Sequence, residues 1–292
     1  MKKKKSNAVV RFYTSMVEQI KTDKVSFTVY AVLRLAVIAV IIRCIIEGRW
    51  ESVYVGVLSL ILFFIPPFVE KNFKIQLPTV LETLAFVFIF CAEILGEIEG
   101  FYVKYAFWDT MLHTVNGFIF AAFGFCLVDI LNRSPRFKFQ LSPVFLAITA
   151  FCFSMTIGVL WEFFEFGVDT LFNLDMQKDT IINHFGSVNF DQSGGNSPQY
   201  IGEIAGSVIE TVDGKLYTVK GYLDIGLIDT MKDLFVNFIG AVVFSIIGFF
   251  YIKKRGKGRI AKQFIPVLMD GEHNEAEDRE IASEDAENKT EE

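Results

Sequence analysis

The chain has 292 residues, of which 52% are hydrophobic and 15% aromatic, and its mean hydropathy is +0.40. This composition excludes an ordinary water-soluble domain and indicates that lipid surrounds much of the chain. The net charge of −6 is uneven, because residues 270–292 alone carry −9 and the remainder carries +3. The basic residues flank apolar runs and form no aromatic-interleaved patch, so we expect membrane lipids as partners and no nucleic acid.

The first 25 residues are basic and amphipathic. Four lysines follow Met1, and residues 9–20 mix apolar and polar side chains without the apolar core and cleavage site of a signal peptide. We therefore expect residues 1–25 to stay attached and to lie on the cytoplasmic membrane surface.

Apolar windows of the length needed to cross a bilayer, roughly 20 residues of helix, recur along the chain. They lie near residues 26–46, 53–69, 79–97, 109–130, 142–166 and 229–252. The second window is short and is expected to end at Pro66 and Pro67. The sequence thus predicts an all-α polytopic membrane protein with about six transmembrane helices, whose membrane domain covers residues 26–252.

Lysine and arginine are abundant in every second connection and scarce in the others. The basic segments are the N-terminal one, those around Lys71 and Arg133, and the stretch after the last helix, which has six basic residues between 253 and 262. Basic loops remain in the cytoplasm, so we expect both termini to be cytoplasmic.

The connection at residues 168–228 is far longer than usual and is expected to be a folded or functional insertion on the exterior side. Strand-like runs at 207–212 and 215–220 flank Asp213-Gly214, which predicts a tight β-hairpin over residues 207–220. We expect the hairpin to cap the exterior end of the helices. Residues 253–292 are basic and then acidic, and we expect them to form a disordered cytoplasmic tail.

Polar side chains recur at helical spacing at the exterior ends of the last three predicted helices, where a charge must be solvated, paired or metal-bound. In the fourth and sixth helices the spacing places each set on one face, and in the fifth two glutamates interrupt an aromatic run. The residues are Asp109, His113 and Asn116; Glu162 and Glu165; and Asp229, Asp233 and Asn237.

Carboxylates this close together repel unless a proton or a cation lies between them, so two functional interpretations are open. In the first, the cluster binds a divalent ion, and mostly oxygen ligands favour Mg²⁺, Mn²⁺ or Fe²⁺ over structural zinc. In the second, the same groups form a proton or cation relay in a transporter. Glu93 and Glu97, at the exterior end of the third helix, would extend either site.

Role assignments follow from the first interpretation. The predicted metal ligands are Asp109, His113, Glu162, Glu165, Asp229 and Asp233. The predicted catalytic residues are Glu162, Glu165 and Asp233, and the predicted substrate-binding residues are Asn116, Asn237 and Arg43.

Simpler explanations compete with these roles. Asp109 and Asp229 stand at helix starts, where aspartate is a common cap. His113 has the alternative of a hydrogen bond to a neighbouring helix, and Arg43 that of snorkelling to the interface. Glu162 and Glu165 lie late in a helix, where the dipole disfavours anions, and are the least cap-like. If all these explanations held, the cluster would be a packing network in a non-catalytic envelope protein.

At these residues the chain resembles the YjdF-like family of bacterial inner-membrane proteins, a domain of unknown function. The shared segments are an Asp-x-x-x-His-x-x-x-Gly-Phe run, an aromatic-Glu-x-x-Glu-aromatic run, and Asp-Thr-x-x-Asp followed by Gly-Ala. They read here as Asp109, His113, Gly117 and Phe118; Trp161, Glu162, Glu165 and Phe166; and Asp229, Thr230, Asp233, Gly240 and Ala241.

The match covers residues 107–241, and the chain departs from the pattern in having Trp108 where tyrosine is usual and in its long exterior loop. Gln177 and Asp179 are candidates for the Gln-x-Asp element that the family has before its last helix. A weaker likeness extends to VanZ-like proteins through Asp109, His113, Asp233 and Asn237. The resemblance implies a bacterial cytoplasmic membrane protein and supplies no activity.

Our working hypothesis is a metal-dependent enzyme that acts on a lipid or envelope precursor at an exterior-facing site. The alternatives are a proton- or ion-coupled transporter and a non-catalytic envelope or membrane-stress protein.

Overall fold

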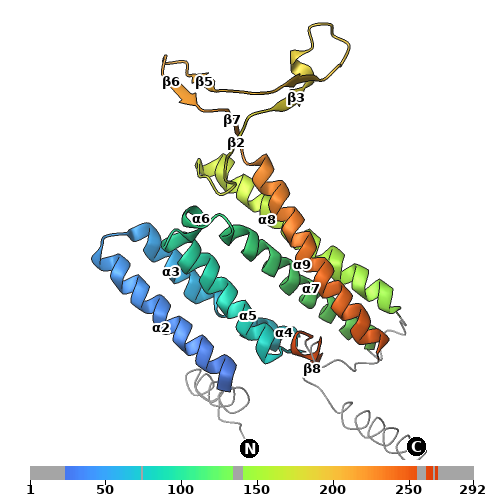
Figure 1. Cartoon of the computed structure of the whole chain (residues 1–292). Coiled ribbons are helices and arrows are strands. Elements are labelled where there is room, and N and C mark those ends of the chain that lie inside the picture. The colour runs from blue at the N-terminus through green and yellow to red at the C-terminus, as the bar shows by residue number, and fades with distance from the viewer. Residues whose placement is uncertain (1–23, 74, 134–140, 255–260, 266, 269–292) are drawn as a thin grey trace, which may run out of the picture.

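The computed structural model describes residues 24–73, 75–133, 141–254, 261–265 and 267–268 (Figure 1). Most of the predicted N-terminal segment and the acidic part of the predicted tail lie outside these residues. The helices are α2 (Lys24–Ile46), α3 (Trp50–Leu62), α4 (Ile65–Phe73), α5 (Thr79–Ile89), the π-helix η1 (Phe90–Ile98), α6 (Phe101–Lys104), α7 (Trp108–Arg133), α8 (Pro143–Phe172) and α9 (Leu227–Lys253).

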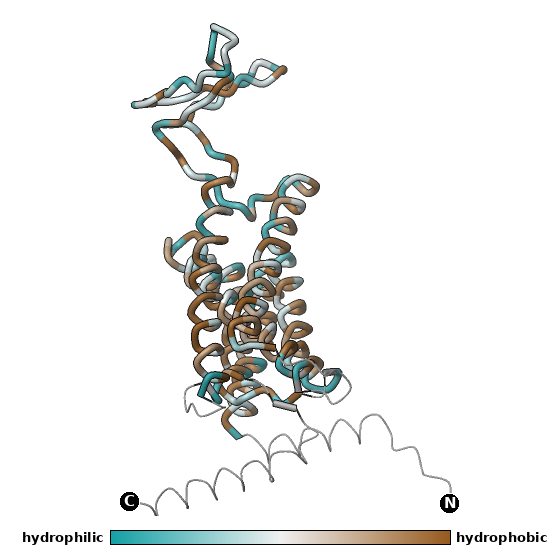
Figure 2. The backbone as a smooth tube through the Cα atoms, turned by 90° about the vertical axis from the view of Figure 1, so that its right-hand side faces the viewer, coloured by the Kyte–Doolittle hydropathy of each residue, from teal (hydrophilic) through white to brown (hydrophobic). Residues whose placement is uncertain are grey.

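These helices supply six segments long and apolar enough to cross a membrane, which confirms the predicted number of spans. Figure 2 shows apolar residues along the full length of the helical part. Many large side chains point outward, such as Leu35 and Phe163, both 67% exposed. Such a surface is expected where lipid takes the place of water.

Two spans differ from their predicted form. The second does not end at the prolines, because α3 is followed directly by α4, whose first turn contains Pro66 and Pro67. The first turn of a helix tolerates proline, since its missing N–H group would have no partner there. The third span changes from α5 to a π-helix, η1, a rare form that is frequent at functional sites.

The helices form two groups, with α2, α3, α5 and η1 on one side and α7, α8 and α9 on the other (Figure 1). The core of the second group includes the buried residues Ala122, Phe125, Leu146, Ala241 and Phe244. Residues 173–226 connect α8 to α9 at one end of this bundle, and we call that end the "loop end".

Glycines let α7 and α9 approach closely. A Cβ atom on Gly240 would lie 2.0 Å from the carbonyl oxygen of Thr114, and one on Gly117 would lie 2.1 Å from that of Asn237. Small residues at such crossings allow two helix backbones to pack in direct contact. The relative position of α7 and α9 is therefore fixed by backbone contact.

Gly240→Ala is expected to destabilise the protein by more than about 1–3 kcal/mol, the usual penalty of overpacking, because the added methyl meets backbone that cannot rotate away. Thermal unfolding in detergent measures this effect. Gly167→Ala in α8 is the matched control, since nothing lies within 4 Å of its added Cβ. Equal melting temperatures for both variants would contradict the close approach.

Strands occupy the long connection between α8 and α9 and a short pairing at the other end of the bundle. Every sheet among the described residues is a two-stranded antiparallel ribbon. The pairs are β2 (Thr180–Ile182) with β7 (Tyr222–Asp224), β3 (Phe185–Ser187) with β4 (Gln199–Ile201), β5 (Ser207–Glu210) with β6 (Leu216–Val219), and β1 (Ile75–Gln76) with β8 (Val267–Leu268). Short 3-10 helices η2 (Val188–Phe190) and η3 (Ala261–Gln263) complete the elements.

The predicted hairpin is present as β5 and β6, but its turn is wider than a two-residue turn. Thr211 donates its N–H to the carbonyl of Lys215 at 2.9 Å, so residues 212–214 form the connection. Gly214 donates its N–H to the carbonyl of Thr211 at 2.8 Å and has a φ of +78°. This three-residue connection ends in a left-handed glycine that forms a bulge, so Asp213-Gly214 marks the turn without being the whole of it.

The hairpin does not cap the helices as predicted. In Figure 1 the strand module, residues 180–224, projects beyond the ends of α8 and α9 on the β2/β7 ribbon. The predicted tail also differs, because β8 pairs with β1 and Ile265 is only 2% exposed. Phe264 and Ile265 pack on the core of the bundle, so this part of the predicted tail is folded.

Candidate functional site

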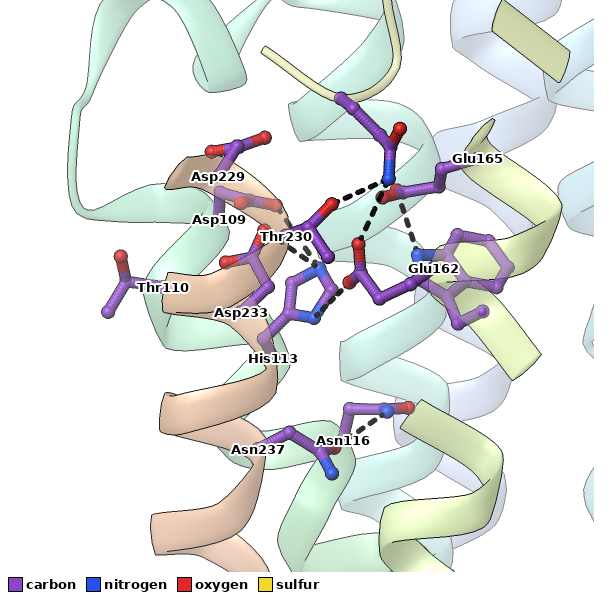
Figure 3. A network of polar contacts seen from close by, with 12 residues as sticks. Asp109, Thr110, His113, Asn116, Glu162, Glu165, Asp229, Thr230, Asp233 and Asn237 are labelled. Atoms are coloured by element: carbon purple, nitrogen blue, oxygen red, sulfur yellow. Dashed lines mark hydrogen bonds and ion pairs between the residues drawn. The ribbon is translucent and has the colours of Figure 1, made fainter. Parts of the chain in front are cut away.

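Helix α7 brings Asp109 and His113 together near the loop end (Figure 3). Their spacing of four residues places them on one face, as predicted, and His113 Nε2 lies 3.6 Å from Asp109 Oδ1. His113 is 8% exposed. A histidine this far from water needs polar partners, and carboxylates supply them.

Helix α9 adds Asp233 to the same nitrogen. Asp233 Oδ2 lies 3.9 Å from His113 Nε2, and Asp233 is 2% exposed. One ligand atom each from Asp109, His113 and Asp233 lie within 4.8 Å of one another. This spacing suits three ligands of one metal ion, so these three members of the predicted ligand set are brought together.

Helix α8 places Glu162 on the other side of the imidazole ring. Glu162 Oε1 lies 4.0 Å from His113 Nδ1, and the residue is 4% exposed. Glu165 lies one turn further along, where its Oε1 accepts a 2.8 Å hydrogen bond from the indole N–H of Trp161. The two glutamates therefore differ: Glu162 faces the histidine, while Trp161 holds Glu165.

Two oxygen atoms in this cluster are buried without a hydrogen-bond partner among the described residues, Glu162 Oε1 and Asp233 Oδ2. Distances of 3.6–4.0 Å to His113 exceed those of ordinary hydrogen bonds. In the part of the chain that the structure describes, no lysine or arginine forms an ion pair with Asp109, Glu162 or Asp233. The cluster thus has negative charge that only protons or a bound cation would neutralise.

The cluster is covered by residues 173–179, which we call the strap. The backbone N–H groups of Met176 and Gln177 donate to the Asp169 carboxylate at 2.6 and 2.8 Å, and that of Lys178 donates to Asp229 Oδ2 at 2.7 Å. Asp229 was predicted to be a metal ligand, but the structure shows it binding the strap and does not group it with Asp109, His113 and Asp233.

Asp169→Asn is expected to loosen the strap, because an uncharged amide accepts hydrogen bonds more weakly than a carboxylate does. The expected result is faster amide hydrogen exchange at Met176 and Gln177, with exchange in the strand module unchanged. Unaltered exchange at both amides would show that Asp169 does not hold the strap.

A layer of amides lies one turn deeper in the bundle than the cluster. Asn116 Nδ2 donates to Asn237 Oδ1 at 3.2 Å, and Asn237 Nδ2 donates to the carbonyl oxygen of Ser154 at 3.5 Å. Asn237 is 1% exposed. These amides join α7, α8 and α9 to one another, so the predicted substrate-binding roles of Asn116 and Asn237 gain no support from their contacts.

Arg43 is not brought into the cluster. Its guanidinium forms ion pairs with Glu99 and, at 3.7 Å, with Glu47. Both partners lie at helix ends of the first group, so the structure gives this predicted substrate-binding residue a local ionic role.

Two residues at the site were not assigned to it from the sequence. Gln177, which the sequence offered only as part of the family's Gln-x-Asp element, contacts Glu162, as described below, and Tyr102 belongs to α6. The Tyr102 ring packs on Gly96 of η1, where an added Cβ would lie 2.4 Å from Cε2. Burial and then the charges of Asp109, Glu97 and Glu93 raise the pKa of the Tyr102 phenol. Tyr102 is therefore near both the carboxylates of η1 and Asp109 of the cluster.

The fold and the cluster define a polytopic membrane protein with an acidic and histidine group at one end of its last three spans. The chain belongs to the family described as "Predicted membrane protein (DUF2238)", whose model matches residues 29–254. The YjdF-like family is this family, so that resemblance is confirmed, whereas the comparisons do not show the likeness to VanZ-like proteins.

A protein of Thermotoga maritima, described as uncharacterised, is 29% identical over 108 residues. The match covers 37% of this chain and 54% of the length of that relative. No solved structure matches the chain.

Proposed function

We propose that this protein binds a divalent metal ion through Asp109, His113 and Asp233 and uses it in chemistry on a lipid or envelope precursor. The observation that carries the proposal is the convergence of ligand atoms from Asp109, His113 and Asp233 on α7 and α9. One of these residues, Asp233, has a buried oxygen, Oδ2, without a hydrogen-bond partner among the described residues. A divalent ion would neutralise the carboxylates and coordinate that oxygen.

The ligand chemistry limits the choice of ion. One imidazole nitrogen and two carboxylate oxygens suit Mn²⁺ or Fe²⁺, while Mg²⁺ and Ca²⁺ prefer oxygen alone. Three protein ligands would leave coordination positions for water and substrate, the arrangement of catalytic metal sites. The ion would lower the pKa of its bound water and polarise an ester or phosphoester oxygen.

Glu165 is our candidate for the general base. It lies outside the three-ligand group, and the hydrogen bond from Trp161 fixes one of its carboxylate oxygens. A carboxylate held in this way would accept a proton from a metal-bound water and return it to a leaving group.

A lipid substrate fits the surroundings of the cluster. It lies near the end of three spans, and neighbouring aromatic side chains of α8, including Phe164 and Phe166, are 53% and 61% exposed on the outside of the bundle. A lipid bound there would place its chains against the aromatic residues and its head group near the carboxylates. The distribution of basic residues supports cytoplasmic termini and an exterior site. The resemblance to the YjdF-like family is the basis for a bacterial cytoplasmic membrane location.

Elemental analysis of detergent-purified protein tests the proposal. We expect near-stoichiometric divalent metal in the parent, and folded His113→Ala protein without it. Glu165→Gln should retain metal, because Glu165 is outside the ligand group, and His184→Ala in the strand module is a matched control.

Metal-free parent protein whose variants stay folded would overturn the metal site and favour a proton or ion relay. Below the amide layer, however, the core of α7–α9 is mainly apolar, with residues such as Ala122, Phe125 and Phe244, and the buried polar residues Asp129 and Ser245 are exceptions. A mainly apolar core disfavours a polar route across the bundle. Unfolding of every cluster variant would instead favour a structural network.

A further inference from the structure

Gln177 is the strap residue whose side chain enters the site. Its amide nitrogen Nε2 donates to Thr230 Oγ1 at 2.6 Å and, through a longer hydrogen bond of 3.4 Å, to Glu162 Oε2. Since an ionised carboxylate only accepts hydrogen bonds, the amide nitrogen is the group that faces Glu162. Both N–H groups of the amide are therefore directed to defined partners, one on α9 and one on α8.

The backbone of Gln177 is held as firmly as its side chain. Its N–H donates to Asp169. Its Cβ lies close to Gly226, the residue directly before α9, and a Cβ added to Gly226 would lie 2.7 Å from it. Gly226 has a φ of +86°, a left-handed conformation that favours glycine. The strap thus presents the Gln177 amide at a fixed position over Glu162.

The two oxygens of Glu162 consequently have separate tasks. Oε2 faces Gln177, and Oε1 faces Nδ1 of His113 at 4.0 Å. The other ring nitrogen, Nε2, faces Asp109 and Asp233 instead. Each nitrogen of the histidine therefore has its own carboxylate environment.

We propose that Gln177 is a positioning residue, which holds Glu162 against Nδ1 of His113 and so leaves Nε2 as the nitrogen that binds the metal ion. This inference rests on the proposed function. Histidine ligands of metals commonly donate their second N–H to a carboxylate, which fixes the tautomer and the ring orientation. Glu162, which the sequence assigned to the metal ligands, is then the partner of His113 and not a ligand.

The test uses the full chain in detergent with Zn²⁺ as the probe, because Zn²⁺ is diamagnetic. Binding is measured by competition with a chelator, and the tautomer of His113 is read from nitrogen NMR of protein labelled in histidine. The chain has three histidines, so the spectrum of His113→Ala assigns the signal of interest. In the parent we expect a protonated Nδ1 and a metal-bound Nε2.

Gln177→Leu removes both donors at similar size. We expect Zn²⁺ affinity to fall by about tenfold, the lower end of the 10–100-fold losses seen at residues that support metal ligands, and the His113 signal to divide between two tautomers. Thr230→Val removes the side-chain anchor of Gln177 together with a hydrogen bond to Glu162, and should act in the same direction, which keeps the test valid if Gln177→Leu fails to fold. Gln199→Leu makes the same change at an exposed glutamine of β4 and should alter neither readout.

Parent affinity and a single parent tautomer in both Gln177→Leu and Thr230→Val would overturn the positioning role. Binding of Zn²⁺ through Nδ1 in the parent would also overturn it, while leaving the metal site itself intact. Parent protein that binds no Zn²⁺ would overturn the proposed function and this inference with it.

Discussion

Asp233→Asn is expected to weaken metal binding by more than 100-fold, beyond the 10–100-fold losses caused by changes in supporting residues. The reason is that it replaces a ligand carboxylate, whose Oδ2 lies near Nε2 of His113, by an uncharged amide. The same change should leave the metal-free protein as stable as the parent, or more stable by ~1–3 kcal/mol. The reason is that Asp233 Oδ2 is buried without a hydrogen-bond donor among the described residues, whereas an amide nitrogen would itself donate to a neighbouring carboxylate.

The two opposite effects separate a binding site from a packing network. Metal titration and thermal unfolding of the metal-free protein measure them on one sample. Asp213→Asn is the matched control, since Asp213 lies on the exposed hairpin and pairs with Lys215 at 2.7 Å. Loss of stability in metal-free Asp233→Asn would contradict our assignment and identify Asp233 as a structural residue.

Added Mn²⁺ is expected to raise the melting temperature of the parent protein by roughly 5–10 °C at a hundredfold excess over its dissociation constant. An ion that binds only the folded state contributes about 2.7 kcal/mol at that concentration. In a chain of this size each kcal/mol corresponds to roughly 2–4 °C.

The shift should vanish in His113→Ala, which lacks the nitrogen ligand, and persist in His184→Ala, whose histidine contacts Asn183 in the strand module. Differential scanning fluorimetry with and without chelator measures all three proteins. An equal shift in His113→Ala would mean that Mn²⁺ stabilises the protein from another place, and the cluster would lose its assigned role.

The spans and the polar stripes could be predicted because each depends on neighbours along the chain. Twenty apolar residues specify a spanning helix wherever they occur, and a spacing of four residues places Asp109 and His113 on one face of any helix. The β5/β6 hairpin was predictable for the same reason, since Gly214 marks its turn locally.

The division of roles within the cluster was not predictable, since it depends on how deep each helix sits beside its neighbours. Asp229 and Asp233 occupy one stripe of α9, and the close contacts that Gly240 and Gly117 allow between α7 and α9 place Asp233 level with His113. The contact of Gln177 with Glu162 was still harder to predict. The distance of 15 residues between the two is bridged by the end of α8 and the strap, a path that no periodic pattern describes.

The strand module joins the rest of the protein at a single point. Thr180 and Asp224 are opposite each other in the β2/β7 ribbon, so the chain enters and leaves the module side by side. Everything between them forms an exchangeable unit: a short linker from residue 180 to residue 224 would keep the strap, the start of α9 and the cluster in place. The strand module could therefore be lengthened, replaced or removed without rebuilding the helices that carry the cluster.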